Sequence, residues 1–326
     1  MSNLERRPVE VMLAEDPRSA ETSPDAVELL EPREVPLGGP RALLVRRTLP
    51  QRARSLVGAW CFADSYGPTV AAGTLTMDTP PHPHTGLQTV SWLVEGEVLH
   101  RDSVGSVQLV RPGQLNLMTA GHGISHSEQS PRDGSPVLHG VQLWTALSDR
   151  DRDVRPHFEH HPDLPVLTDT GATVKVIMGE VAGTASPAAI YSPLVGVEAV
   201  LEPGADTHLP LQPSWEYAAL TLAGSVDIDG VALTPGPLLY LGAGRSDLPL
   251  RAHTSARLLL IGGEPFEEHI VMWWNFVGRD HDDIATAREH WMAADPRFGT
   301  VPGYPGDRLP APALPTVRLK PRGRHP

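Results

Sequence analysis

The chain has 326 residues, of which 40% are hydrophobic, and a formal net charge of −12 at pH 7. This length is sufficient for two domains, each with its own core. The acidic balance argues against direct nucleic-acid binding, because phosphate contacts need clustered lysine and arginine. No segment approaches the roughly 18 apolar residues of a membrane span, so we expect no membrane association.

The cellular location follows from the first residues and from the cysteine content. The N-terminal residues are polar and mixed in charge, unlike a secretory signal. Cys61 is the only cysteine, which rules out an internal disulfide and favours a reducing compartment. We therefore expect a cytoplasmic protein. Cys61 lies in the apolar run AWCFAD, and we expect it to be buried rather than redox-active.

Both ends of the chain differ in composition from its centre. Residues 1–36 mix acids, proline and serine without periodicity, which is typical of a flexible tail. Residues 301–326 are rich in proline, and we expect a second flexible tail there. Between the tails we expect one domain over 37–150 and another over 151–300.

Short alternating segments, bounded by glycine, proline or aspartate, recur between the tails. Their β-branched and aliphatic residues predict strands. The clearest examples are 42–49, 87–94, 106–110, 217–222, 226–233 and 256–263. One helix is predicted at 280–293, with Asp280 as its cap. Its apolar residues recur on one face at Ile284, Ala287 and Trp291.

The strand pattern occurs twice along the chain. SWLVEGEV (91–98) resembles ALTLAGSV (219–226), and RPGQLNLM (111–118) resembles TPGPLLYL (234–241). Each unit reads strand, glycine turn, strand, Pro-Gly turn, strand, which is the order found in a small antiparallel barrel of jelly-roll type. We therefore predict an all-β fold of two antiparallel jelly-roll barrels with a short C-terminal helix.

A set of metal-ligating residue types lies in the first of these units. His82 and His84 are two residues apart in PHPHTG, and His126 and Glu128 have the same spacing in GISHSE. Residues at i and i+2 of a strand project from one face. Two neighbouring strands would thus offer three imidazoles and one carboxylate to one divalent transition metal: iron, manganese, nickel, copper or zinc. Four protein ligands would leave one or two positions open on such a metal.

The second unit serves as an internal control. When its turns are aligned with those of the first unit, the four ligand positions fall on Pro210, Gln212, Pro249 and Arg251. None of these is a usual ligand for a transition metal. We therefore expect metal only in the first barrel, over residues 37–150.

Other histidines have simpler interpretations. His157, His160 and His161 are interpreted as a solvated linker between the barrels rather than a second metal cluster. His100 is interpreted as a hydrogen-bonded structural residue, with a place beside the metal ligands as the alternative. His122 either faces the pocket or lies outside it.

Several stretches together resemble the pirin family of bicupins, that is, chains with two cupin barrels. They are VRRTLP (45–50), ADSYGP (63–68), HPHTGLQTVSWLVEGEVLHRDSVGSV (82–107), PGQLNLMTAGHGISHSE (112–128) and IVMWWNFVG (270–278). The resemblance covers roughly residues 40 to 295 and implies a bicupin fold. It implies that His82, His84, His126 and Glu128 bind one metal ion, usually Fe²⁺.

The resemblance also implies an activity, quercetin 2,3-dioxygenation, with a flavonol-like small aromatic substrate and O₂. Glu128 would then be the catalytic general base that takes the substrate's hydroxyl proton. The alternative is an iron-dependent, redox-sensing regulatory protein that binds a protein partner without turnover. Two positions depart from many relatives: Gln88 stands where a glutamate is common, and His122 where an arginine is common.

Overall fold

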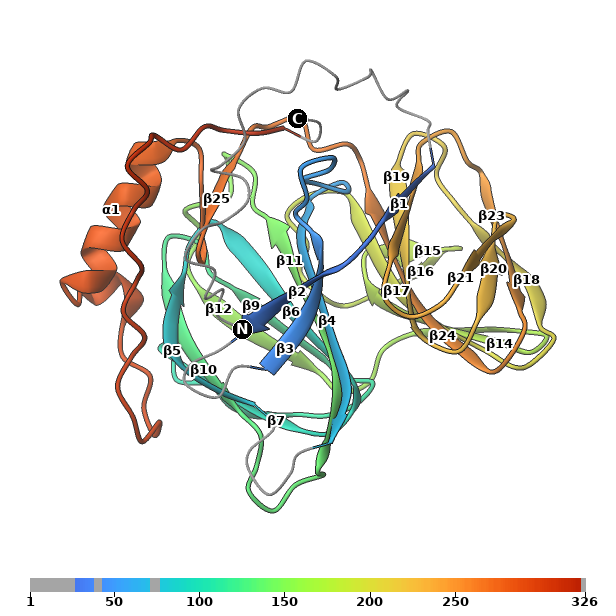
Figure 1. Ribbon diagram of the computed structural model, residues 1–326, viewed down its shortest axis with the longest axis horizontal. Coiled ribbons are helices and arrows are strands. Elements are labelled where there is room, and N and C mark those ends of the chain that lie inside the picture. Colours follow the sequence, from blue (N-terminus) through green and yellow to red (C-terminus); the bar gives the residue numbers. More distant parts are fainter. Residues whose placement is uncertain (1–26, 38–42, 71–76, 324–326) are drawn as a thin grey trace.

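Two β-barrels lie side by side in the computed structural model, which describes residues 27–37, 43–70 and 77–323 (Figure 1). All strand pairs within the sheets of the first barrel are antiparallel. The larger sheet of the first barrel consists, in spatial order, of β12 (His157–His161), β9 (Leu115–Thr119), β6 (Leu87–Glu95), β11 (Val137–Ala146), β4 (Trp60–Val70), β3 (Leu43–Leu49) and β2 (Arg33–Leu37). The smaller sheet consists of β5 (Asp78–His84), β10 (Ile124–Gln129), β7 (Val98–Asp102) and β8 (Val107–Val110).

The second barrel repeats this plan. Its larger sheet consists of β1 (Glu28–Leu30), β22 (Leu238–Gly242), β19 (Glu216–Ala223), β24 (Ala256–Gly263), β17 (Leu194–Leu201), β14 (Ala172–Met178) and β13 (Val166–Asp169). Its smaller sheet consists of β18 (Asp206–Pro210), β23 (Asp247–Ala252), β20 (Val226–Ile228) and β21 (Val231–Leu233). A short ribbon pairs β15 (Glu180–Val181) with β16 (Thr184–Ala185). The predicted all-β fold of two antiparallel barrels is confirmed.

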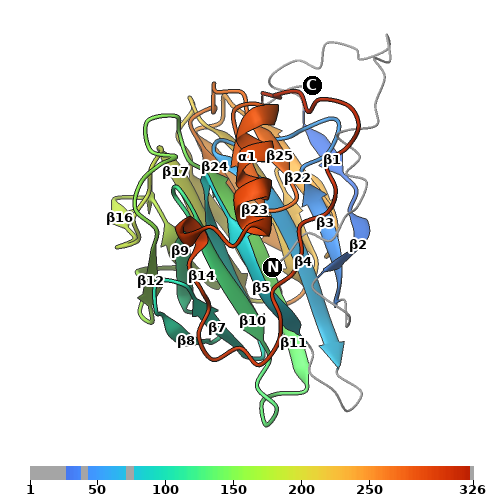
Figure 2. The ribbon, with the colours of Figure 1, turned by 90° about the vertical axis from the view of Figure 1, so that its left-hand side faces the viewer.

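After the second barrel the chain returns to the first. It forms a hairpin of β25 (Val271–Trp273) and β26 (Phe276–Gly278), then the helix α1 (His281–Met292) and a 3₁₀ turn, η2 (Pro296–Phe298). Figure 2 shows α1 on the side of the molecule formed by the first barrel. The helix predicted at 280–293 is confirmed: the Asp280 carboxylate accepts hydrogen bonds from the first-turn amides, and the three predicted apolar residues are buried. None of the helices within the described ranges is long and apolar enough to cross a membrane.

Buried tryptophans of the first barrel join it to the second. The Trp60 indole Nε1 donates hydrogen bonds to the carbonyls of Val195 and Gly262, at 3.2 and 3.1 Å. The Trp92 indole donates to the Glu198 carboxylate at 2.9 Å. Because buried polar groups must find partners, each of these bonds ties the barrels in one relative orientation.

The expected domain limits need three corrections. Residues 28–36 are not a tail, because β1 pairs with β22 of the second barrel and β2 with β3 of the first. Residues 157–161 belong to the first barrel rather than to the second, because β12 pairs with β9. The reason is the same in both cases: edge strands are added by backbone hydrogen bonds, which leave little trace in the side-chain pattern. The third correction concerns the C-terminal segment 301–326. Residues 1–26 of the expected N-terminal tail lie outside the described residues.

The expected flexible segment 301–326 is packed against the molecule as far as residue 323. The Leu309 amide donates to the Pro81 carbonyl at 2.8 Å, and Arg322 exchanges two backbone hydrogen bonds with Ile270. Ala311 and Leu319 are buried in the same apolar cluster as the helix residue Trp291. The prolines exclude regular structure here, but two apolar side chains and scattered amides suffice to dock the segment. Residues 324–326 lie outside the described part of the chain.

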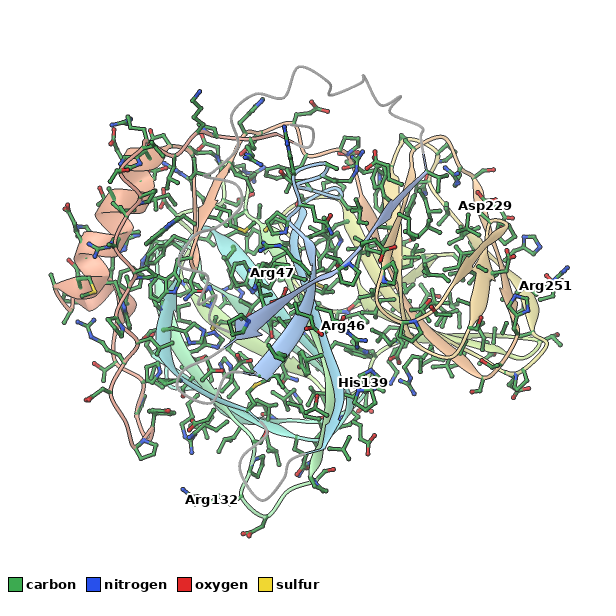
Figure 3. All side chains as sticks on the ribbon, viewed as in Figure 1. Arg46, Arg47, Arg132, His139, Asp229 and Arg251 are labelled. Carbon is green, nitrogen blue, oxygen red and sulfur yellow. The ribbon has the colours of Figure 1, made fainter. Side chains whose placement is uncertain are left out.

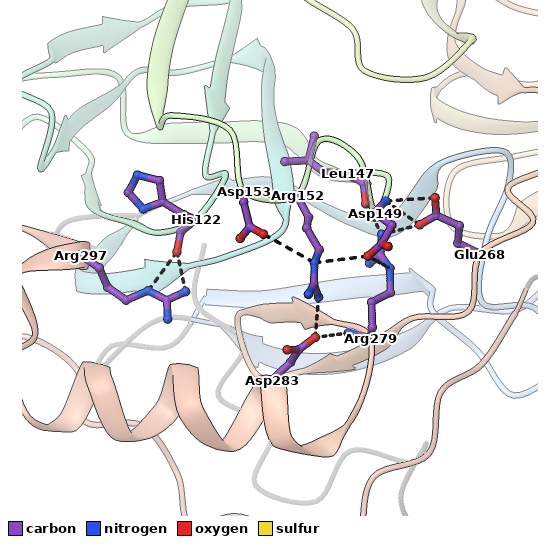
Figure 4. A network of polar contacts seen from close by, with 9 residues as sticks. All are labelled: His122, Leu147, Asp149, Arg152, Asp153, Glu268, Arg279, Asp283 and Arg297. Carbon is purple, nitrogen blue, oxygen red and sulfur yellow. Dashed lines mark hydrogen bonds and ion pairs between the residues drawn. The ribbon is translucent and has the colours of Figure 1, made fainter.

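A network of ion pairs and hydrogen bonds attaches the hairpin and α1 to the loop at 147–153 of the first barrel (Figure 4). The Arg152 guanidinium contacts the Asp283 carboxylate at 2.5 Å, and Arg279 donates to the Leu147 carbonyl at 2.8 Å. The Asp149 amide donates to Glu268 at 2.8 Å. Glu268 precedes the hairpin and Arg279 follows it, so both ends of the hairpin are held against one barrel.

A buried ion pair joins the neighbouring strands β3 and β4 of the first barrel, where Arg47 donates to both oxygens of Asp64 at 2.8 Å. Figure 3 contrasts Arg47, inside the first barrel, with Arg251 at the outer edge of the second. We expect Asp64→Asn to lower the free energy of unfolding by about 3–5 kcal/mol, because it removes the negative charge from a buried ion pair that is bonded through both carboxylate oxygens. Chemical denaturation would measure this. Asp206→Asn, which breaks the exposed pair with Arg251, is the control and should change nothing measurable. Equal effects of the two variants would contradict the argument.

The single thiol should be inert in the folded protein. Cys61 is fully buried, and burial raises the pKa of its thiol to about 12. Thiol reagents attack the thiolate, which is scarce at pH 8 for such a group. We expect no reaction with a chromogenic disulfide reagent in native protein and one equivalent after unfolding. Rapid stoichiometric reaction of the native chain would show that Cys61 is accessible.

Candidate metal centre

Three imidazoles meet inside the first barrel. His82 and His84 lie on β5, and His126 lies on the neighbouring strand β10, directly opposite His82. The first two are fully buried and His126 is 1% exposed. One ring nitrogen from each lies within 4.8 Å of the others, and the three rings have centroids 4.3–5.1 Å apart. The spacing of two along each strand thus directs these histidines to one point.

Hydrogen bonds identify the nitrogens that converge. His82 Nδ1 lies 2.8 Å from the Pro80 carbonyl, and His84 Nδ1 lies 3.2 Å from the Asn275 carbonyl. A carbonyl only accepts, so each Nδ1 carries the proton and each Nε2 keeps a lone pair. His82 Nε2 is buried without a hydrogen-bond partner, and His84 Nε2 lies 3.1 Å from His126 Nε2. A cation bound between these nitrogens would satisfy all three.

The burial of the site keeps the imidazoles neutral. Desolvation lowers the pKa of His82, His84 and His126 well below the usual value of 6.5. Charges on the neighbouring rings lower the pKa of His84 and His126 further. Neutral imidazole is the form that binds a metal, so the residues present suit a divalent transition metal at neutral pH.

Glu128 lies beside this group rather than within it. It follows His126 by two residues on β10 and is 2% exposed. Its Oε1 atom lies 3.4 Å from the Ser91 hydroxyl of β6, which is itself 2.9 Å from Gln142 Oε1. The group of ligand atoms within 4.8 Å of one another leaves Glu128 out. The structure thus brings together three of the four predicted ligands, and Glu128 as a ligand stays a prediction.

Strand β5 can supply a carbonyl to His82 because its ladder is irregular. His126 faces His82, but Glu128 faces Thr79, so the register between β5 and β10 shifts between them. Pro80 and Pro81 occupy the shift and have no N–H to leave unpaired. The Pro80 carbonyl then accepts from His82, and the Pro81 carbonyl accepts from the C-terminal segment.

The carbonyl that orients His84 comes from the C-terminal hairpin. Trp274 and Asn275 form its two-residue turn, and Trp274 has a φ of +54°, where glycine is usual. Asn275 is fully buried. Beside it, the Val277 amide donates to the Thr85 carbonyl at 3.0 Å, which docks β26 next to the ligand strand. The strained turn is thus held where it delivers a carbonyl to His84.

A second layer lies behind His126. His100 Nδ1 lies 3.3 Å from His126 Nδ1, and His100 Nε2 lies 3.2 Å from Asp102 Oδ2. Both residues are buried on β7. Burial opposes ionisation of Asp102, but hydrogen bonds from His100 and Ser106 outweigh it and hold the pKa of the carboxyl below its usual value. Both interpretations of His100 agree with these contacts: it is hydrogen-bonded to Asp102, and it lies beside His126, one of the predicted ligands. Sequence reasoning missed Asp102, for which the spacing His-x-Asp on a strand was the available signal.

The remaining sequence candidates lie elsewhere. His157 and His161 do not form a linker: both lie on β12, where they contact Glu159 at 3.3 and 3.0 Å. His122 is exposed, and its carbonyl accepts from Arg297 (Figure 4). Gln88 is buried and donates to the Thr119 hydroxyl at 2.9 Å.

The second barrel shows no counterpart of the histidine group. The three-histidine cluster is the one such group found among residues 27–37, 43–70 and 77–323. At the equivalent positions, Pro210 and Gln212 are exposed, and Arg251 forms its exposed pair with Asp206.

Comparison with known proteins agrees with this architecture. The pirin family model matches residues 42–145, and the model of the pirin C-terminal cupin domain matches residues 196–299. A Pseudomonas aeruginosa protein named as a candidate quercetin 2,3-dioxygenase is 44% identical over 283 residues, which cover 87% of this chain and 89% of that protein. Human pirin is 34% identical over 220 residues, covering 64% of this chain and 74% of its own.

A solved structure shares the overall fold. The crystal structure of a quercetin 2,3-dioxygenase from Acinetobacter baumannii superposes with a TM-score of 0.85 at 44% sequence identity. The match covers 90% of this chain and 97% of that one. Both barrels, the order of their domains and the similarity to named relatives lead to one assignment: this chain belongs to the pirin family of bicupins.

Proposed function

We propose that this protein is a metal-dependent dioxygenase of the quercetin 2,3-dioxygenase type that acts on a flavonol-like substrate with O₂. The observation that carries the proposal is the convergence of three neutral, buried imidazole nitrogens at one point. The Pseudomonas and Acinetobacter relatives, each 44% identical, support the reaction class by their names.

His82, His84 and His126 would hold the metal through Nε2, and Glu128 would reach it as the fourth ligand. Three imidazoles and one carboxylate suit Fe²⁺, the metal we favour, and also manganese, nickel, copper or zinc. When bound, such an ion would accept the oxygens of a flavonol and lower the pKa of its hydroxyl. The imidazoles contribute by remaining neutral and in fixed orientations.

Glu128 is the residue that we assign to proton transfer. It is buried on the strand that carries His126, and the Ser91 hydroxyl lies 3.4 Å from its carboxylate. From this place the carboxylate would take the 3-hydroxyl proton of the substrate, which makes the substrate electron-rich toward O₂. Addition of O₂ and cleavage of the central ring would then release carbon monoxide and a depside.

Oxygen uptake with quercetin tests the reaction directly. Protein depleted of metal under anaerobic conditions would be reloaded separately with iron, manganese, nickel, copper and zinc. We expect uptake that depends on the metal and is matched by carbon monoxide release. Loss of a ligand in His126→Ala should abolish both uptake and stoichiometric metal binding. His161→Ala is the matched control, because that histidine contacts Glu159 on an edge strand instead.

Metal binding without uptake, for every metal tried, would overturn the dioxygenase proposal. It would favour the alternative drawn from the sequence, a redox-sensing regulatory protein that binds a partner without turnover.

The role of Glu128 has a separate test. Glu128→Gln keeps the shape of the side chain but removes the base, and general base catalysis typically contributes about 10²–10⁴-fold. We expect oxygen uptake to fall by about 100-fold or more while part of the metal binding remains. Steady-state uptake and metal analysis of the same preparation would measure both. Wild-type turnover in this variant would show that the base is another group.

A further inference from the structure

The buried hydrogen-bond chain Asp102–His100–His126 has a fixed order of donors and acceptors. We propose that Asp102 and His100 are positioning residues that hold His126 in the tautomer whose Nε2 lone pair faces His82 and His84. This inference rests on the proposed metal centre, but it concerns the protein's own protons, which exist with or without metal.

The order of donors and acceptors is set at Asp102. Its Oδ1 atom accepts hydrogen bonds from the backbone amides of Val104 and Ser106, at 3.0 and 2.8 Å. This turn leaves Oδ2 facing His100 Nε2 at 3.2 Å. Because a carboxylate only accepts, the proton of His100 must lie on Nε2. Phe158 stacks on the His100 ring with a centroid distance of 4.5 Å and so holds the orientation of that ring.

The proton position of His100 then sets that of His126. With its proton on Nε2, His100 offers a lone pair at Nδ1, which lies 3.3 Å from His126 Nδ1. His126 therefore donates from Nδ1 and keeps its lone pair on Nε2. That nitrogen lies 3.1 Å from His84 Nε2, at the point where the ligands converge. Each proton position in the chain follows from the one before it.

The position of His126 in the sheet explains why it needs a side-chain acceptor. His82 and His84 lie on β5, an edge strand, and take their carbonyls from an irregular ladder and from the hairpin. Strand β10 instead pairs with β5 on one side and β7 on the other, and His126 is in register with residues of both. Its neighbouring carbonyls belong to the ladders, so an imidazole supplies the acceptor.

Asp102→Asn tests the chain because it should reverse the order of donors and acceptors. The two backbone amides keep the amide oxygen at the Oδ1 position, so the NH₂ group must face His100 Nε2. A donor there moves the His100 proton to Nδ1, and His126 must then accept at Nδ1 and carry its proton on Nε2. The substitution adds no volume, yet it places a proton on the nitrogen meant for the metal.

Two measurements read the switch. In metal-free protein with ¹⁵N-labelled histidine, NMR should show His126 protonated on Nδ1 in the wild type and on Nε2 in Asp102→Asn, with His82 and His84 unchanged. In competition with a chromophoric chelator, the affinity for Ni²⁺ should fall about 10- to 100-fold, as for other residues that orient metal ligands. Asp78→Asn, on the same sheet but bonded to Gln129 and Tyr304, is the control and should leave both readouts unchanged.

A second variant guards against misfolding of the first. His100→Phe can still stack on Phe158 but offers no acceptor, so His126 should populate both tautomers and bind Ni²⁺ with an affinity between those of wild type and Asp102→Asn. Wild-type His126 already protonated on Nε2, or tautomers and affinity unchanged in both variants, would overturn the inference. The NMR readout needs neither metal nor substrate. A chain that failed to oxidise quercetin would therefore still support the inference if His126 switched nitrogens.

Discussion

The structure of the first barrel depends on the burial of three uncharged imidazoles with their lone pairs directed at one another. Such an arrangement is costly in a protein interior unless a cation joins the nitrogens and every other polar atom has a partner. Each imidazole accordingly has a separate acceptor at Nδ1: the Pro80 carbonyl, the Asn275 carbonyl and the His100 ring. The register shift of β5, the C-terminal hairpin and the β7 turn are the local structures that supply these three acceptors.

The two barrels share a plan, but their buried polar groups have different roles. In the second barrel, Glu216 accepts from the Gly58 amide and the Tyr240 hydroxyl, at 2.6 and 2.8 Å. Glu198 accepts from the Trp92 indole and from Arg257. These carboxylates lie at the junction between the barrels, whereas His82, His84, His100 and His126 of the first barrel face its interior. One fold thus holds a candidate metal centre in one copy and a docking surface in the other, because the site depends on particular residues and not on the barrel.

The return of the chain to the first barrel links the far end of the sequence to the site. Hairpin β25–β26 carries a strained turn at Trp274, a conformation that costs on the order of 1–3 kcal/mol and persists only when its surroundings enforce it. The enforcing contacts are the Thr85–Val277 hydrogen bond and the ion-pair network around Arg152, Arg279 and Asp283. The packed segment 301–323 also lies against the ligand strand β5, where the Leu309 amide donates a hydrogen bond to the Pro81 carbonyl.

By itself the sequence determined the barrel repeat, the helix at 281–292 and the three histidines, because each is encoded in a local period of two or 3.6 residues. Only the tertiary structure decided which strands close each barrel, since edge strands such as β1 and β12 pair through backbone groups that all residues share. It also decided what stands behind the ligands. The His100–His126 contact crosses from β7 to β10, and the Asn275 carbonyl reaches His84 across 191 residues of chain; no local pattern records contacts between such separate segments.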